Sequence, residues 1–121
     1  MLTDGYIRWV RSMINIAVVD DEPLFIDTLI NKIADCCSSL KIKYFVDKYS
    51  NGYDILENYK SYHLIFLDIE MPSMDGIETA KKINELKGDS EIPFLFLLQA
   101  IDEFVFDALK FSLFIYTKIG Y

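Results

Sequence analysis

Three carboxylates in this chain directly follow or end apolar stretches. Asp20 and Asp21 follow INIAVV (14–19), and Asp68 ends HLIFLD (63–68). Burying an unpaired charge is costly, so each acid is expected at the open end of a strand. Two carboxylates about 4 Å apart repel by roughly 4 kcal/mol at an effective dielectric near 20. A divalent cation would remove this repulsion, and oxygen ligands favour Mg²⁺, which also binds phosphate oxygens.

The elements that must position these acids alternate between strands and helices. Continuous apolar or alternating stretches predict five strands, at 14–19, 41–50, 63–68, 92–98 and 113–119. Helical spacing of apolar residues predicts four helices, at 23–37, 53–60, 77–87 and 102–111. Pro23 is well placed in the first turn of the first helix.

This alternation predicts an α/β fold with a doubly wound, five-stranded parallel sheet covered on both faces. In such a sheet, ligands bind at the carboxyl ends of the strands near the topological switch point. If the strand order is 2-1-3-4-5, the first and third strands are neighbours. The side chains of Asp20, Asp21 and Asp68 then converge at one edge and form a site for a metal and a phosphoryl group.

Composition limits the classes of function. The chain has 121 residues, enough for one domain, and a formal net charge of −7, which argues against nucleic-acid binding by the domain itself. No apolar run approaches the length of a membrane span, and a cytoplasmic location without membrane contact is expected. The adjacent Cys36 and Cys37 are the only cysteines and are expected to be free thiols. Residues 1–12 are interpreted as an N-terminal extension and 13–121 as the domain.

One acidic pair before a helix is a common capping arrangement, but the joint pattern is far more specific. VVDDEP (18–23) and FLDIEMPSMDG (66–76) together resemble the acidic pocket and phosphoacceptor loop of bacterial response regulator receiver domains. The resemblance implies a flavodoxin-like fold in which Asp68 accepts a phosphoryl group from a histidine kinase. It also implies that Mg²⁺ is held by Asp20, Asp21, Asp68 and the backbone carbonyl of Glu70. The residues that shape the loop into the next helix would be Pro72, Asp75 and Gly76.

The groups that read the phosphate depart from the family pattern. Gln99 stands where the family has Thr or Ser, and Ile119 stands where it has Lys. Lys118 is one residue early, and successive strand residues point to opposite faces, so it reaches the pocket only through a bulge. Tyr116 occupies the position of the family's switch aromatic. The pocket that takes the phosphate therefore matches the family better than the groups that read it.

The resemblance predicts phosphorelay signalling, in which the domain catalyses only its own phosphorylation and dephosphorylation. It would switch a C-terminal output domain, with DNA-binding transcription regulation expected because IEMPSMDGIETAKKI (69–83) and DEFVFDALKFS (102–112) look most like receivers of the LytTR type. The altered residues leave open a degenerate receiver that acts as a phosphorylation-independent interaction module. A haloacid-dehalogenase-type phosphatase fits poorly, because its nucleophile ends the first strand.

The family places a fifth helix after the fifth strand, and the domain is interpreted as truncated before it. The sheet face beside the first helix is then expected to lack cover near Leu113, Phe114 and Tyr116. Apolar patches of this kind usually mark interfaces. A homodimer through the face formed by helix 102–111 and the fifth strand is therefore a further expectation.

Overall fold

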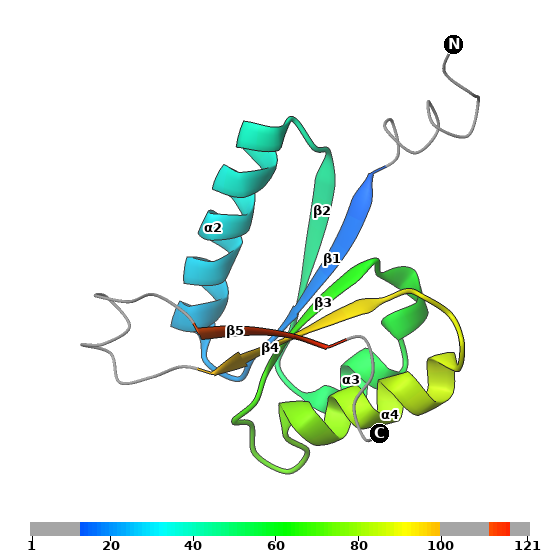
Figure 1. The fold of residues 1–121 in the computed structure, drawn as a ribbon. Coiled ribbons are helices and arrows are strands. Elements are labelled where there is room, and N and C mark those ends of the chain that lie inside the picture. Colours follow the sequence, from blue (N-terminus) through cyan, green and yellow to red (C-terminus); the bar gives the residue numbers. More distant parts are fainter. Residues whose placement is uncertain (1–12, 100–111, 117–121) are drawn as a thin grey trace.

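A computed structural model gives the structure of the protein and describes residues 13–99 and 112–116 (Figure 1). The elements occur in the order β1 (Ile14–Val19), α2 (Pro23–Leu40), β2 (Tyr44–Tyr49), α3 (Gly52–Leu56), a 3₁₀ helix η1 (Tyr59–Ser61), β3 (Leu64–Asp68), α4 (Gly76–Lys87), β4 (Phe94–Gln99) and β5 (Ser112–Tyr116). The predicted helix at 102–111 and the extension at 1–12 lie outside the described residues.

The strands form one sheet in the order β2-β1-β3-β4-β5, as predicted for a flavodoxin-like doubly wound fold. The pairs β1–β2, β1–β3 and β3–β4 are parallel, which confirms the predicted parallel arrangement for the first four strands. Because β1 and β3 are neighbours, the ends of these two strands lie side by side, as the convergence of the acids requires.

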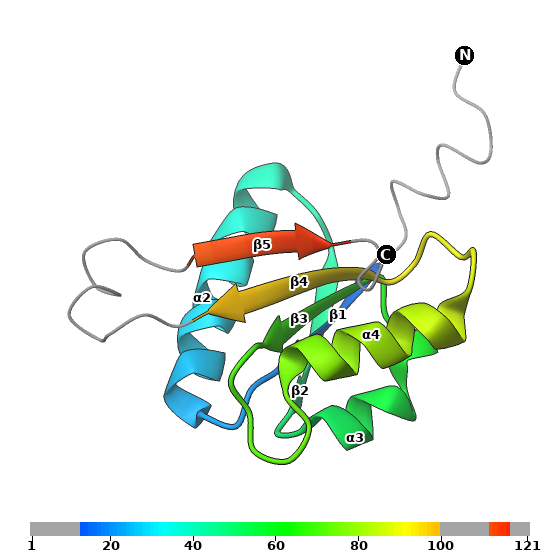
Figure 2. The same ribbon diagram turned by 60° about the horizontal axis from the view of Figure 1, so that its bottom comes forward.

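The fifth strand corrects the prediction of an all-parallel sheet. β5 pairs antiparallel with β4, with Gln99 opposite Ser112 and Leu95 opposite Tyr116 (Figure 2). A parallel neighbour would require a crossover over the sheet, and such a connection needs about 10–12 residues or more including its helix. The connection from β4 to β5 spans residues 100–111, at the lower end of that range. An antiparallel neighbour needs no crossover.

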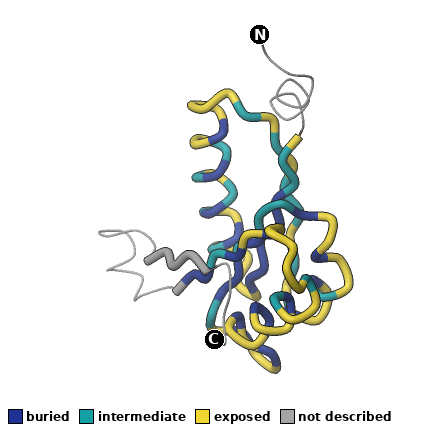
Figure 3. Tube along the Cα trace, turned by 45° about the vertical axis from the view of Figure 1, so that its right-hand side comes forward, coloured by how far each residue is buried: buried dark blue, intermediate teal, exposed yellow. Residues whose placement is uncertain are grey.

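The sheet lies between two layers of helix, with α2 on one face and α3 and α4 on the other (Figures 1 and 2). Strand β1 is apolar on both faces because both are covered, and its residues 16–19 are buried. Ala17 and Val19 pack toward α3 and α4, whereas Ile16 and Val18 pack toward α2. Alternating buried and exposed residues along α2 show that only one side of this helix meets the sheet (Figure 3).

The ends of the helices and strands follow local chemistry. Helix α2 begins at Pro23, as predicted, and ends later than predicted, with Lys41 in a left-handed C-cap at φ 56°. Its N–H donates to the carbonyls of Cys37 and Ser38, which satisfies the last turn. Strand β4 begins after Pro93 rather than at residue 92, because proline has no N–H to donate to a neighbouring strand. No helix in the described ranges is both long and apolar enough to cross a membrane.

The α2 side of β3 and β4 carries a row of incompletely covered aromatic side chains. The rings of Phe66 and Phe96 stack at a centroid distance of 4.9 Å and are half-buried. Phe94, on the same side of β4, is 39% exposed. The predicted lack of cover near Leu113, Phe114 and Tyr116 stays a prediction, because the side chains of these three residues lie outside the described residues.

Candidate functional site

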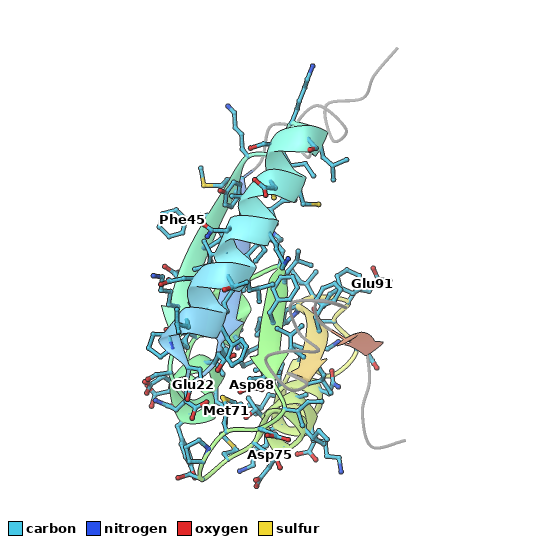
Figure 4. The ribbon with its side chains drawn as sticks, turned by 90° about the vertical axis from the view of Figure 1, so that its left-hand side faces the viewer. Glu22, Phe45, Asp68, Met71, Asp75 and Glu91 are labelled. Atoms are coloured by element: carbon cyan, nitrogen blue, oxygen red, sulfur yellow. The ribbon has the colours of Figure 1, made fainter. Side chains whose placement is uncertain are left out.

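The three predicted acids meet at the carboxyl ends of β1 and β3. Val19 pairs with Leu67, so the residues that follow them, Asp20 and Asp68, extend from neighbouring strands. One carboxylate oxygen from each of Asp20, Asp21 and Asp68 lies within 4.8 Å of the others. Asp20 and Asp68 are each 7% exposed, while Asp21 lies at the surface. Figure 4 shows Asp68 near Glu22 at this end of the molecule.

Each buried acid is held by a backbone N–H two residues further along the chain. The N–H of Glu22 donates to Oδ1 of Asp20 at 2.9 Å. The N–H of Glu70 donates to Oδ1 of Asp68 at 3.2 Å. These two bonds orient the carboxylates at the strand ends, where the carboxyl groups of Asp20 and Asp68 also hydrogen-bond each other. The predicted ligand from Glu70 is its carbonyl oxygen, which belongs to the same turn.

Burial dominates the electrostatics of the pocket. It raises the pKa of Asp68, and the nearby charge of Asp20 raises it further, to about 7. Burial also raises the pKa of Asp20, although the N–H of Glu22 and a hydrogen bond from Asp68 act in the opposite direction. The two carboxyl groups therefore share a proton when no cation is present. Retention of this proton near neutral pH means that the surroundings do not stabilise two negative charges in the pocket.

This repulsion predicts that Asp68→Asn stabilises the metal-free protein. The folded-state pKa of Asp68 lies above the unfolded value, so the folded protein binds more protons between about pH 4 and 7. The free energy of unfolding of the wild type should therefore fall as the pH rises through this window. At pH 7.5 the variant should be more stable by about 1–2 kcal/mol, less than the full pKa shift implies because water enters beside Asp21.

Urea denaturation in EDTA at pH 5 and pH 7.5 measures this difference. Asp89→Asn, at an exposed turn on the other side of α4, is the matched control and should change stability little at either pH. If Asp68→Asn loses as much stability between pH 5 and pH 7.5 as the wild type does, charge repulsion at Asp68 is not the cause of that loss.

The loop after β3 is tied to Asp68 by a close approach at Gly76. The N–H of Gly76 donates to the carbonyl of Ile69 at 3.0 Å. A Cβ atom at position 76 would lie 2.1 Å from the backbone oxygen of Asp68. Glycine is thus required where α4 begins, which gives a physical basis for the loop-shaping role predicted from the Asp-Gly pair. Pro72 is exposed in this loop and precedes Ser73, whose φ is 67°.

Helix α4 is anchored beneath the site by its N-cap. Oδ1 of Asp75 accepts the N–H of Glu78 at 2.8 Å, an arrangement that satisfies one free donor of the first turn. The buried Thr79 donates its hydroxyl to the carbonyl of Asp75 at 2.7 Å. Sequence reasoning missed Thr79 and also the burial of Met71 and Met74. The apolar methionines on either side of a turn were the signal that this loop packs onto the core.

The structure places the predicted phosphate-reading residues only in part, through the backbones of Gln99 and Tyr116. Gln99 ends β4, one residue beyond Leu98, which pairs with Asp68. Tyr116 pairs with Leu95 near the start of β4, because β5 runs antiparallel, so its backbone lies toward the other end of the sheet. The side chains of Gln99 and Tyr116, and the whole of Lys118 and Ile119, lie outside the described residues. Their predicted roles stay predictions.

The chemistry of the acid cluster fits a magnesium ion. All three side chains offer carboxylate oxygens, the ligand type that Mg²⁺ prefers, and Asp21 keeps one side of the cluster open for waters or phosphate oxygens. A cation bound there would offset the burial and the Asp20 charge that raise the pKa of Asp68.

Comparison with known proteins agrees with this geometry. Residues 16–114 match the response regulator receiver domain. The chain belongs to this family. Receiver domains are components of two-component phosphorelay signalling. Membership in this family explains the order of the first four strands and the acids at the ends of β1 and β3.

Among curated proteins, the receiver is 32% identical to an uncharacterised response regulatory protein of Vibrio cholerae, over 77% of this chain and 34% of that protein. It is 46% identical to the sensory transduction protein LytT of Oceanobacillus iheyensis over a shorter stretch, 38% of this chain and 20% of LytT. The chain thus spans about a third or less of these two relatives.

Among solved structures, the receiver is similar to the response regulator TrrA of Thermotoga maritima in complex with Mg²⁺ and beryllium fluoride. The TM-score is 0.60 and the identity 33%, over 81% of this chain and 78% of TrrA. TrrA has also been solved in complex with the histidine kinase ThkA, where the TM-score is 0.58 and the identity 32%, over 76% of this chain and 73% of TrrA.

Proposed function

We propose that this receiver accepts a phosphoryl group on Asp68 from a histidine kinase in the presence of Mg²⁺. The observation that carries the proposal is the convergence of Asp20, Asp21 and Asp68, whose ligand oxygens lie within 4.8 Å of one another. The likeness to TrrA, which forms complexes with a histidine kinase and with Mg²⁺–beryllium fluoride, supports the same donor and metal. The domain acts on itself and is not an enzyme with a separate substrate.

The residues of the pocket divide the work of the transfer. Oδ1 of Asp68 accepts the Glu70 N–H, which holds the carboxylate in place while its other oxygen would attack once the proton shared with Asp20 has left. That oxygen forms a bond to phosphorus while the bond from phosphorus to the kinase histidine nitrogen breaks, and the nitrogen leaves with the electron pair. Bound Mg²⁺ supplies positive charge that offsets the charge of the phosphoryl oxygens. Asp20, Asp21 and Asp68 would hold the metal, with the backbone carbonyl of Glu70 as a further ligand.

The metal site gives a direct test. Titration of Mg²⁺ into ¹⁵N-labelled protein should shift the amide signals of residues 20–22 and 68–70. Asp21→Ala should weaken Mg²⁺ binding by about tenfold or more, because an exposed ligand is lost without disturbing the core. Asp27→Ala, which removes an exposed carboxylate from α2, is the matched control and should bind Mg²⁺ as the wild type does. Equal affinity in all three proteins would place the metal elsewhere.

The signal is proposed to pass from the receiver to an output domain, with DNA-binding transcription regulation as its role. The greater length of the curated relatives and the likeness to LytT over 48 residues support this extension. A cytoplasmic location suits a substrate of a histidine kinase. A homodimer through helix 102–111 and β5 is part of the same proposal, and the partly exposed Phe94 on β4 supports self-association on that side of the sheet.

A second candidate is a receiver that acts as an interaction module independent of phosphate. Two observations favour it: Gln99 replaces the expected hydroxyl residue, and Tyr116 pairs with Leu95, away from the acids. Amide shifts on addition of beryllium fluoride and Mg²⁺ separate the two candidates. Shifts that extend from the pocket along β4 and β5 support switching by phosphate. Shifts confined to residues 20–22 and 68–76 support the interaction module.

A further inference from the structure

A surface cavity lies toward the end of the sheet opposite the acid cluster. It has a volume of about 370 Å³ and is lined by residues of η1, of the last turn of α4 and of the chain that leads into β4. Phe94 pairs with Leu64, and Asp68 lies four residues further along β3, which corresponds to roughly 13 Å. Figure 4 shows Glu91, which precedes this stretch, well away from Asp68, Met71 and Asp75. The cavity is therefore separate from the proposed phosphorylation site.

The floor and rim of this cavity are apolar. Tyr59 and Pro93 are buried beneath it. Leu86 and Ile92 stand at its rim and are 60% and 46% exposed. Leu86 lies three residues after Ile83 on α4, and Ile83 is fully buried whereas Leu86 is not. A concave site framed by large exposed apolar side chains is typical of a surface that gains stability by binding an apolar group.

The charged side chains that line the cavity are both cationic. Lys60 and Lys87 line it, and the lining residues include no carboxylate, although the whole chain has a net charge of −7. The ammonium of Lys87 donates to the carbonyl of Ser90, and the hydroxyl of Ser90 donates to the carbonyl of Ile92 at 3.0 Å. These bonds fix the wall before any ligand arrives. Lys60 is exposed and forms no ion pair within the described ranges.

We propose that this cavity docks a peptide segment of a partner protein in which large apolar side chains are flanked by carboxylates. The apolar side chains would cover Tyr59, Leu86 and Ile92, and the carboxylates would pair with Lys60 and Lys87. The positive charges of Lys60 and Lys87 favour a ligand with carboxylates beside its apolar side chains. The cavity is open to solvent, which favours side chains presented by a peptide over a small molecule that needs full enclosure.

The test uses a peptide blocked at both ends, Ser-Glu-Leu-Phe-Glu-Ser, titrated into the ¹⁵N-labelled full chain. It should shift the amide signals of residues 59–60 and 86–92 and leave those of residues 20–22 and 68–70 in place. Two matched peptides, one with Lys in place of Glu and one with Ala in place of Leu and Phe, should bind about tenfold more weakly. No shift at 59–60 and 86–92 at roughly 1 mM peptide would overturn the proposal, as would equal binding of all three peptides.

A variant pair locates the contact. Lys60→Glu with Lys87→Glu should weaken binding of the acidic peptide about tenfold, while Lys43→Glu with Lys81→Glu, which makes the same change of charge elsewhere, should not. Both pairs should gain a phosphoryl group like the wild type, so failure of this docking site and failure of the proposed phosphorylation are distinguishable. Equal weakening by both pairs would show that only overall charge matters and would overturn the proposal.

Discussion

Asp68→Asn should gain no phosphoryl group from acetyl phosphate and Mg²⁺, whereas the wild type should gain one. The substitution keeps the size and shape of the side chain, and its amide oxygen can still accept the N–H of Glu70. It removes only the anionic oxygen that attacks phosphorus, and a neutral amide is a very poor nucleophile. Intact-mass spectrometry of both proteins after the same incubation measures the result. The loss should be complete, because no other residue of the pocket is proposed as a nucleophile.

The neighbouring acids provide the contrast for this experiment. Asp21→Ala should slow phosphorylation through weaker metal binding but still gain a single phosphoryl group at long incubation. Asp89→Asn, far from the pocket, should react as the wild type does. A mass gain in Asp68→Asn would show that another residue accepts the phosphoryl group and would refute the assignment of Asp68. Peptide mapping would then identify the residue that reacts.

Gly76→Ala should destabilise the protein by roughly 3 kcal/mol and impair phosphorylation at Asp68. The added Cβ would lie 2.1 Å from the backbone oxygen of Asp68 and 3.0 Å from Cα of Ile69. Backbone atoms cannot rotate away as a flexible side chain does, so either α4 or the end of β3 must move. A shift of the strand end moves Asp68 relative to Asp20. Urea denaturation and the initial rate of phosphorylation measure the two effects.

Gly88→Ala is the matched control for Gly76→Ala. Gly88 has a φ of 60°, so alanine is strained there and also lowers stability, but nothing lies within 4 Å of the added atom. It lies just beyond the C-terminal end of α4, away from Asp68. This variant should lose stability and keep the phosphorylation rate of the folded protein. Equal rates in the two variants would show that the contact at Gly76 does not position Asp68.

The acid cluster was predictable from the sequence because it depends on local patterns. Apolar stretches such as INIAVV mark buried strands, and a carboxylate directly after one of them must lie at the strand end. Alternation with helices then implies parallel strands, which bring such ends to one edge of the sheet. The adjacency of β1 and β3 completes the prediction for Asp20, Asp21 and Asp68. The strand order 2-1-3-4-5 did not follow from these local patterns; it was a condition of the prediction, and the structure confirms it.

Three features were decided only by the tertiary structure. The antiparallel direction of β5 depends on the path between strands, which residue periodicity does not encode. The raised pKa of Asp68 depends on how deeply its carboxyl group is buried beside Asp20, which follows from packing in three dimensions. The exposure of Leu86 depends on where α4 leaves the sheet, because a helical repeat specifies a face but not how far the sheet extends beneath it. The sequence by itself thus determined which acids meet at one edge of the sheet, because that depends on local patterns and on strand ends. The tertiary structure decided how deeply those acids are buried and which apolar side chains are exposed, because both depend on packing.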